Sequence, residues 1–344
     1  MPFEIIPFGT SIDFLGRRRI CLAISLALIA LGIGAVIARG GVPLGIDFVG
    51  GTEIQILFDE GVDVDESSLR EVVGEAGILD ASVVRFGEEE LNEYLVRFKA
   101  APEVAPAESP EASESEEPVD GLAANTRIIR LEDTIRERIG PFTEQRVEFV
   151  GPRVGAELRS DGVNALFFSA LAILAYVAFR FNARFAPGAV VAVIHDLTIT
   201  GGLLVIAGVE FDLQILAAML AILGYSLNDT IIIYDRIREN MELHTAVDLE
   251  EVLNVSVNQT LSRTVLTSLT TMLALLSLYF LGGEVIRPFA FAMLIGVIVG
   301  TYSSIFIASP LLLVLEQRYG DAGEKRGKGK KGSTKRASEK AARA

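Results

Sequence analysis

Three acidic or basic side chains stand inside long apolar stretches of this sequence, where a charge is expensive. Asp229 follows Asn228 in one stretch, and Asp196 follows His195 in the stretch before it. Arg263 opens a later stretch. Burial disfavours an ionised carboxylate and a neighbouring guanidinium favours it, so the two effects together can bring proton exchange within the physiological range. These residues therefore predict a proton relay inside a membrane, with Asp229 at its centre.

The depths of the three side chains predict that they lie within reach of one another. If the cytoplasmic boundaries of the stretches are near residues 188, 235 and 261, a helical rise of about 1.5 Å per residue puts Asp196 ~12 Å, Asp229 ~9 Å and Arg263 ~3 Å deep. The long arginine side chain spans the remaining gap, so the two acids and the base are expected to meet. A static ion pair remains the alternative for Asp229, and a hydrogen bond to a hydroxyl remains the alternative for Asp196. The role of His195 stays open.

Hydrolytic chemistry finds little support in the same residues. An aspartyl protease needs two carboxylates that share a proton, which Asp196 could supply with Asp229 or Asp235. The residues before Asp229, however, are Ser-Leu-Asn and not the Gly-x-Gly-Asp of intramembrane aspartyl proteases. Cys21 is the single cysteine, and the sequence has no G-x-x-x-x-G-K-[ST] phosphate loop. We expect no enzyme activity, no cofactor and no metal.

Six apolar stretches are long enough to cross a membrane. Half of the 344 residues are hydrophobic and the mean hydropathy is +0.42, which is too apolar for a soluble chain. The predicted spans are residues 20–38, 163–179, 188–208, 211–234, 262–281 and 289–315. We expect the first to be an uncleaved anchor and not a signal peptide, because its apolar run is long and no small-residue cleavage site follows it. The expected fold is an α-helical polytopic membrane protein.

Basic residues near the ends of the spans predict which side each loop faces. Residues 1–19 contain three consecutive arginines, and the segments after the second and fourth spans are also basic. The opposite short loops hold only Arg287, whereas the tail 316–344 is rich in lysine and arginine. Both termini are therefore expected in the cytoplasm, and the acidic region 39–162 on the other side. We expect the tail to be attracted to lipid headgroups and not to nucleic acid.

Residues 39–162 form the expected external domain. Apolar patterns predict strands at 52–58, 80–86, 93–98 and 143–150, and helices at 65–76 and 126–139. The order β-α-β-β-α-β is that of a split βαβ unit, so we expect an α+β ferredoxin-like domain between the first two spans. Residues 100–124 are almost entirely Ala, Pro, Glu, Ser and Val, a composition that predicts a disordered insertion.

The connection between the fourth and fifth spans is also expected to contain a helix. Residues 235–261 are predicted to form a cytoplasmic loop, and Asp248 with Glu251 resembles a capping box. The apolar residues that follow Asp248 form one stripe. An amphipathic helix on the inner membrane surface and an ordinary connector fit this stripe equally well.

Three motifs carry a family resemblance. They are Gly45-Ile-Asp-Phe-Val-Gly-Gly-Thr52, Val147-Glu-Phe-Val-Gly-Pro152, and Gly224-Tyr-Ser-Leu-Asn-Asp-Thr230 with the following Tyr234-Asp-Arg-Ile-Arg-Glu-Asn240. His195-Asp196 and Gln259-Thr-Leu-Ser-Arg-Thr264 look like sequence of the same family. Together they resemble the SecF branch of the SecD/SecF family of protein-export membrane proteins, over residues 10–318. The residues that match the first motif are Gly45, Asp47, Phe48, Gly50, Gly51 and Thr52.

The resemblance implies half of an RND-type bundle in the bacterial cytoplasmic (inner) membrane. Its implied partners are SecD, the SecY-SecE-SecG channel, preproteins and membrane lipid, with YajC and YidC as further candidates. The implied function is to use the proton-motive force, together with SecD, in late steps of preprotein export. Asp229 and Arg263 match the proton-pathway positions of the family. Two alternatives stay open: an RND-type half-transporter for small molecules or lipids, and a structural subunit without proton coupling.

Overall fold

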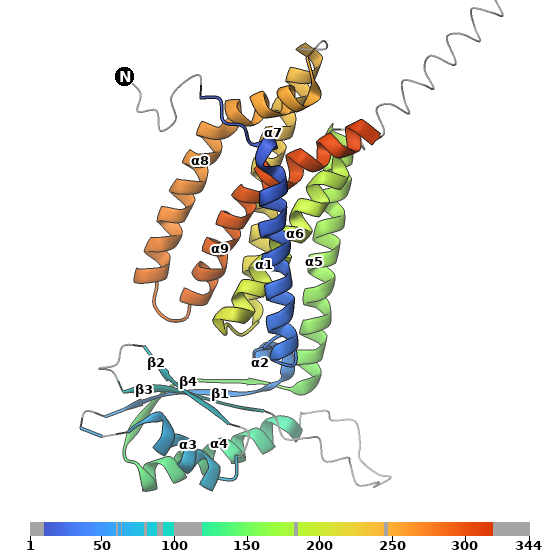
Figure 1. Ribbon diagram of the computed structural model, residues 1–344. Coiled ribbons are helices and arrows are strands. Elements are labelled where there is room, and N and C mark those ends of the chain that lie inside the picture. The colour runs from blue at the N-terminus through green and yellow to red at the C-terminus, as the bar shows by residue number, and fades with distance from the viewer. Residues whose placement is uncertain are drawn as a thin grey trace, which may run out of the picture.

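The computed structural model of the chain describes residues 10–59, 61–62, 64–78, 81–87, 92–99, 119–181, 185–243 and 247–318. A bundle of long helices stands at one end and a small sheet with its own helices at the other (Figure 1). The sheet lies between α1 and α5 in the chain, where the sequence predicted a separate domain. We call residues 46–150, from α2 to β4, the α/β domain.

Six helices in the described part of the chain are long and apolar enough to cross a membrane, which confirms the predicted number of spans. The central helices α6, α7 and α9 are largely buried, whereas α1, α5 and α8 lie at the periphery. The six helices are α1 (Arg18–Ala38, after the 3-10 turn η1, Leu15–Arg17), α5 (Pro152–Phe181), α6 (Ala186–Ala207), α7 (Leu213–Leu243), α8 (Leu249–Leu281) and α9 (Arg287–Ser303), which continues through the π turn η3 (Ser304–Ala308) to residue 318.

Small residues let the central helices approach one another. A Cβ on Gly296 of α9 would lie 2.3 Å from the side chain of Ile222 on α7. One turn further along α9, a Cβ on Gly300 would lie 3.1 Å from Ser226. Close packing of small residues is what holds helices together in lipid, because lipid tails are as apolar as the side chains they would replace. The Gly-x-x-x-Gly face of α9 is therefore a packing surface against α7.

The α/β domain is a four-stranded antiparallel sheet in the order β2-β3-β1-β4. Its two longer helices cover the face of the sheet that points away from the bundle (Figure 1). Alternate residues of β1, including Ile54 and Ile56, meet Leu69, Leu131 and Ile135 of these helices in one apolar core. The elements are α2 (Ile46–Val49), β1 (Gly51–Phe58), α3 (Glu66–Glu75), β2 (Ser82–Phe86), β3 (Glu93–Lys99), α4 (Val119–Arg138) and β4 (Phe142–Val150).

Helix α5 extends well beyond the predicted span 163–179. It begins at Pro152, so residues 152–162, which the sequence analysis placed in the external domain, are a helical extension of the span. An apolar run shows which part of a helix suits hydrocarbon, but it does not show where the helix begins. The extension brings α5 against the α/β domain, where a Cβ on Gly155 would lie 2.9 Å from the backbone nitrogen of Gly50.

The connection between α7 and α8 differs from the predicted loop. α7 continues to Leu243, and α8 runs without a break from Leu249 to Leu281, so residues 235–261 are mostly the ends of two long helices. No glycine or proline interrupts residues 249–281, so the helix that begins at Leu249 continues into the fifth span without a break. Asp248 occupies the N-cap position without a side-chain cap hydrogen bond, so the predicted capping box is wrong.

The predicted insertion 100–124 falls largely outside the described residues, as do residues 1–9 and 319–344. Its last residues, 119–124, are described and begin α4, so a disordered state is wrong for that end of the insertion. The helix gains its stability further along, where Ile128 and Leu131 are buried against the sheet. Once that turn is anchored, adding helical residues in front of it is favourable.

The segment before α1 docks on α8, a contact that the sequence did not predict. The side-chain amide of Asn258 makes two hydrogen bonds with the backbone N–H and C=O of Ile12, each 2.8 Å long. The backbone N–H of Phe14 donates to the Oδ1 atom of Asn254 at 2.9 Å. These two asparagines lie one turn apart on α8 and hold an extended segment alongside the helix.

Candidate functional site: buried polar residues in the bundle

Asp229 is buried in the middle of α7. Neither oxygen of its carboxyl group has a hydrogen-bond partner among the described residues. The polar groups that act on it, Ser268 and Arg263, both come from α8. The Ser268 hydroxyl is already engaged with Thr301 of α9, at 2.7 Å. A buried carboxyl without partners is costly when ionised, and it can take up or release a proton without breaking any hydrogen bond.

Arg263 and Asn228 lie on the exposed surface of the bundle. The charge of Arg263 acts on Asp229, but no ion pair joins these two described residues. The expected meeting of Asp196, Asp229 and Arg263 is therefore not observed. The number of residues from the membrane boundary fixes how deep in the membrane a residue lies. The rotation of the helix about its own axis decides which side of the helix that residue faces. Asp229 faces the interior of the bundle, and Arg263 and Asn228 face away from it.

Asp196 of α6 lies in a separate, fully hydrogen-bonded cluster. Its Oδ1 atom is 2.9 Å from the Nδ1 atom of His195. Its Oδ2 atom accepts hydrogen bonds from the hydroxyl of Ser303 on α9, at 2.7 Å, and from the hydroxyl of Ser226 on α7. All four side chains are buried. Asp196 thus joins three helices through hydroxyl groups, which is the alternative that the sequence had left open for it.

His195 extends this cluster to the periphery of the bundle. Its Nε2 atom is 2.9 Å from the hydroxyl of Ser25 on α1, and that hydroxyl is 3.1 Å from the hydroxyl of Tyr302 on α9. The Tyr302 hydroxyl donates to the backbone carbonyl of Cys21 at 2.6 Å. Ser25 and Tyr302 were not predicted as site residues, because a single hydroxyl in an apolar helix carries no spacing signal. Only their proximity to His195 makes them part of the site.

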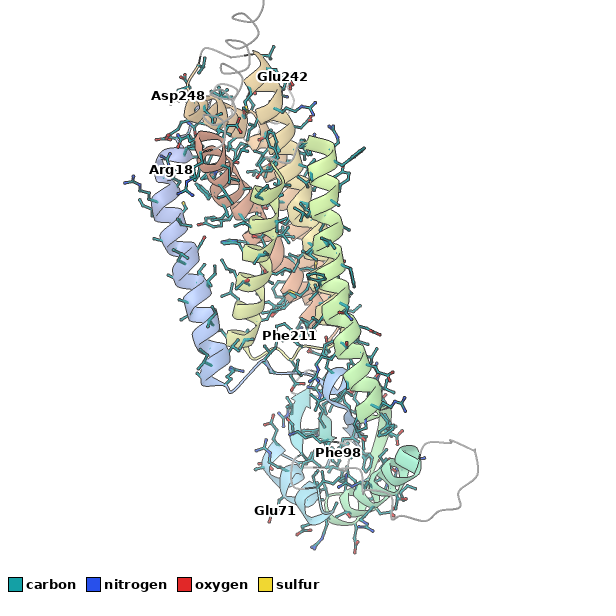
Figure 2. The ribbon with its side chains drawn as sticks, turned by 90° about the vertical axis from the view of Figure 1, so that its right-hand side faces the viewer. Arg18, Glu71, Phe98, Phe211, Glu242 and Asp248 are labelled. Carbon is teal, nitrogen blue, oxygen red and sulfur yellow. The ribbon has the colours of Figure 1, made fainter. Side chains whose placement is uncertain are left out.

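The Gly45–Thr52 motif forms the joint between α1, the α/β domain and α7. The backbone N–H of Gly45 donates to the carbonyl of Phe211 at 2.8 Å, and Phe211 lies at the end of the bundle near the strand that carries Phe98 (Figure 2). The carboxylate of Asp47 accepts a hydrogen bond from the backbone N–H of Leu213 at 2.9 Å. Asp47 therefore caps the helix that carries Asp229.

The two adjacent glycines of the motif are required by close backbone approach. Gly50 has a φ of +80°, and a Cβ there would lie 2.7 Å from the Cα of Pro152. A Cβ on Gly51 would lie 2.7 Å from the carbonyl oxygen of Phe98. Phe48 and Thr52 are buried beside them. Only glycine accepts both the positive φ and the contact with the first turn of α5.

A cavity of about 330 Å³ lies between the sheet and the bundle, and its walls are rich in acidic residues. Arg97 of β3 crosses it and pairs with Glu53 on β1 and with Glu210 before α7. Burial raises the pKa of Asp212 in the cavity wall, and the nearby charge of Asp47 raises it further. Arg97 therefore offsets part of a negative field where the domain meets the bundle.

No group of three or more His, Cys, Asp or Glu side chains in the described part of the chain could hold a metal ion. The buried polar residues of this site are instead hydroxyl, imidazole and carboxyl groups that come from α1, α6, α7, α8 and α9. Such groups can bind and pass protons. The arrangement is therefore suited to holding protons at defined atoms within the bundle.

Comparison with known proteins identifies relatives along almost the whole chain. Residues 131–318 match the family described as protein export membrane protein SecD/SecF, C-terminal, and residues 36–62 match the SecD/SecF GG motif. The protein translocase subunit SecF of Calditerrivibrio nitroreducens is 40% identical over 321 residues, covering 91% of this chain and 97% of that protein. SecF of Pseudomonas aeruginosa is 40% identical over 310 residues, covering 90% and 93%.

A solved structure is similar over the same region. The crystal structure of SecDF, a translocon-associated membrane protein from Thermus thermophilus, is 37% identical with a TM-score of 0.76, and the alignment covers 92% of this chain. The chain spans 40% of the length of that protein. A second structure, SecDF in the super-membrane-facing form, is 36% identical with a TM-score of 0.64.

Proposed function

The chain belongs to the SecF branch of the SecD/SecF family of protein-export membrane proteins, and on this premise we propose that it couples proton movement to preprotein export. The observation that carries the proposal is the carboxyl group of Asp229, which is buried without a hydrogen-bond partner among the described residues. In this position a proton can be bound and released as the helices around it move. We assign Asp229 the central place in a proton relay.

The exposed polar residues beside Asp229 support a role for a second subunit. Arg263 and Asn228 are exposed on helices that would otherwise meet lipid, where a charged or amide side chain is unfavourable. A second six-helix subunit, the SecD protein, would cover them and bring further polar groups to Asp229. The bundle would then be one half of an RND-type pair, and the α/β domain its ferredoxin-like external domain. The other proposed partners are the SecY-SecE-SecG channel, preproteins, YajC, YidC and membrane lipid.

The energy available from protons is sufficient for a domain movement. One elementary charge that crosses 100 mV releases about 2.3 kcal/mol, so a few protons could drive a rearrangement of the α/β domain. The domain is held to α7 through Asp47 and to α1 and α5 through the glycine motif. A movement of α7 near Asp229 would therefore be transmitted to the domain through these direct contacts. We place both termini in the cytoplasm of a bacterium and the domain on the opposite side of the inner membrane.

The test is preprotein export into inverted vesicles that contain the full complex, with and without an uncoupler. Asp229→Asn keeps the shape of the side chain and removes the exchangeable proton, so we expect the uncoupler-sensitive part of export to disappear. Asp235→Asn is the matched control, because Asp235 lies on the same helix but is exposed and paired with Arg180 at 3.7 Å. Uncoupler-sensitive export by the Asp229→Asn variant would exclude the relay. It would leave a structural subunit as the explanation.

A further inference from the structure

Helix α1 buries few residues against the bundle. Only Ser25 and Gly32 are buried along its length, and both face α6. A Cβ on Gly32 would lie 2.8 Å from the Cα of Gly202, so the two backbones touch there. About two turns before it, the Ser25 hydroxyl contacts His195. These are the two buried contacts of α1 with α6. At its ends α1 is also held by the pair of Arg18 with Glu250 on α8 and by the hydrogen bond from Arg39 to the carbonyl of Ile206 on α6.

The hydrogen bonds around Ser25 can be assigned a direction. Tyr302 has a single hydroxyl hydrogen, and it is donated to the carbonyl of Cys21. The hydrogen between Ser25 and Tyr302 must therefore come from Ser25. The Ser25 oxygen is left as an acceptor for His195, so the Nε2 atom of His195 carries a hydrogen. The chain of donors runs from His195 through Ser25 and Tyr302 to the backbone of α1.

This direction fixes how many protons the His195–Asp196 pair must hold. With Nε2 protonated, the contact between Nδ1 and the Asp196 Oδ1 atom also needs one hydrogen, carried either by the imidazolium or by the carboxylic acid. If that proton leaves, two arrangements remain. In the first, a lone pair of the His195 Nδ1 atom faces a lone pair of the Asp196 Oδ1 atom at 2.9 Å. In the second, the remaining imidazole hydrogen moves from Nε2 to Nδ1. In the second case Ser25 must donate to His195, and its hydrogen bond to Tyr302 is lost.

We infer that His195 and Asp196 form a second proton-binding site, separate from Asp229, whose proton holds α1 against the bundle. The first arrangement disturbs a contact within α6, and the second removes the hydrogen bond that joins Ser25 of α1 to Tyr302 of α9. Few other titratable groups face the pair. They are Cys21 on α1 and Tyr302 on α9, and the stretch 163–175 of α5 has no ionisable residue. Asp229 on α7 is acted on by Ser268 and Arg263 of α8 and not by this pair. Ser226 and Ser303 occupy the other carboxylate oxygen.

The position of α1 gives this site a consequence outside the bundle. α1 ends at Ala38, and only a short connection separates it from the glycine motif and β1 (Figure 1). The cysteine and tyrosine contacts lie near the far end of α1, so they do not themselves restrain the α/β domain. The chain enters the domain from α1 and leaves it into α5, so loosening α1 would loosen one of the two chain connections of the domain. Proton binding at His195–Asp196 would thus regulate how firmly the domain is held.

The experiment measures the position of α1 in the full chain reconstituted in nanodiscs. Nitroxide labels are attached at Ile37→Cys on α1 and Leu281→Cys on α8, both highly exposed positions, in a Cys21→Ser background. Distances are recorded by double electron–electron resonance from about pH 5 to about pH 9, the range in which histidine and buried carboxyls exchange protons. We expect a narrow distance distribution at low pH that broadens in a single-proton transition as pH rises.

Four variants decide the outcome. Asp196→Asn can donate its amide hydrogen to Nδ1 as the protonated acid does, so the distribution should stay narrow at every pH. Ser25→Ala removes the link to α1, so the distribution should be broad at every pH. His195→Gln should also remove the transition, and it replaces Asp196→Asn as the test if the asparagine variant does not fold. Asp229→Asn should keep the transition. The inference is wrong if the labelled chain shows no transition, if Asp196→Asn and His195→Gln retain it, or if Asp229→Asn abolishes it.

Discussion

The carboxylate of Asp47 accepts a hydrogen bond from the backbone N–H of Leu213 at 2.9 Å, although these residues are far apart in the sequence. Leu213 is the first residue of α7, and Asp212 caps the same helix through the N–H of Ile215, at 2.8 Å. Two carboxylates thus occupy the positive end of the helix dipole. Through this cap, α2 at the start of the α/β domain is tied directly to the helix that carries Asp229.

Replacing Asp47 should loosen this connection. Asp47→Ala leaves the N–H of Leu213 without its acceptor, and the loss of an N-cap side chain costs about 1 kcal/mol. We expect faster hydrogen exchange at the start of α7 and in the 43–50 segment, with little change at the other end of α7. Asp59→Ala, at an exposed position of the same domain, is the control. Equal exchange rates in both variants would show that the cap does not hold the joint.

The contact between Gly32 and Gly202 should not tolerate a methyl group. Gly32→Ala places a Cβ 2.8 Å from the Cα of Gly202, and overpacking of this kind costs about 1–3 kcal/mol. We expect a lower midpoint of thermal unfolding in detergent. Gly34→Ala is a close control on the same helix, because nothing lies within 4 Å of its Cβ position. That variant should be neutral or slightly more stable, since alanine is the better helix former.

Glu132 should make the α/β domain less stable as pH rises. Burial raises the pKa of Glu132 to about 7, and the hydrogen bond and charge of Glu144 act in the same direction. The folded state therefore binds this proton more tightly than the unfolded state, whose pKa is near 4.5. The stabilisation is complete below about pH 4.5 and is lost as pH rises towards about 7.

Hydrogen exchange of the β4 amides between these pH values provides the measurement. Glu132→Gln should protect β4 better than the unaltered chain at neutral pH and should reduce the pH dependence of that protection. Glu137→Gln lies on the exposed side of the same helix and should leave both unchanged. Unaltered pH dependence in the Glu132→Gln variant would contradict the assignment.

Arg263 should act through Asp229 even though no ion pair joins them in this chain. Arg263→Lys keeps the positive charge but loses the planar fork that can hold a carboxylate, so it should insert normally and export poorly. The double variant Asp229→Asn/Arg263→Gln should export no worse than either single variant, because one relay is lost only once. Losses that multiply in this cycle would show that the two residues do separate tasks.

The sequence by itself determined the features that depend on local composition. The apolar runs predicted six membrane-spanning helices, because the thickness of a bilayer sets their length. Period-two and helical patterns predicted the order of strands and helices in the α/β domain, because they mark which residues meet a core. The Gly45–Thr52 motif and the buried acid Asp229 also stood out, since glycine pairs and charges are rare in such surroundings.

Only the tertiary structure decided which polar groups meet. The depth estimate placed Asp196, Asp229 and Arg263 at similar heights, yet the rotation of each helix separated them into an unpartnered acid, a hydrogen-bonded cluster and an exposed guanidinium. Ser25 and Tyr302 entered the cluster from helices distant in the sequence. Spacing along one chain fixes which residues share a face of a helix, but the packing of helices against one another fixes what that face touches.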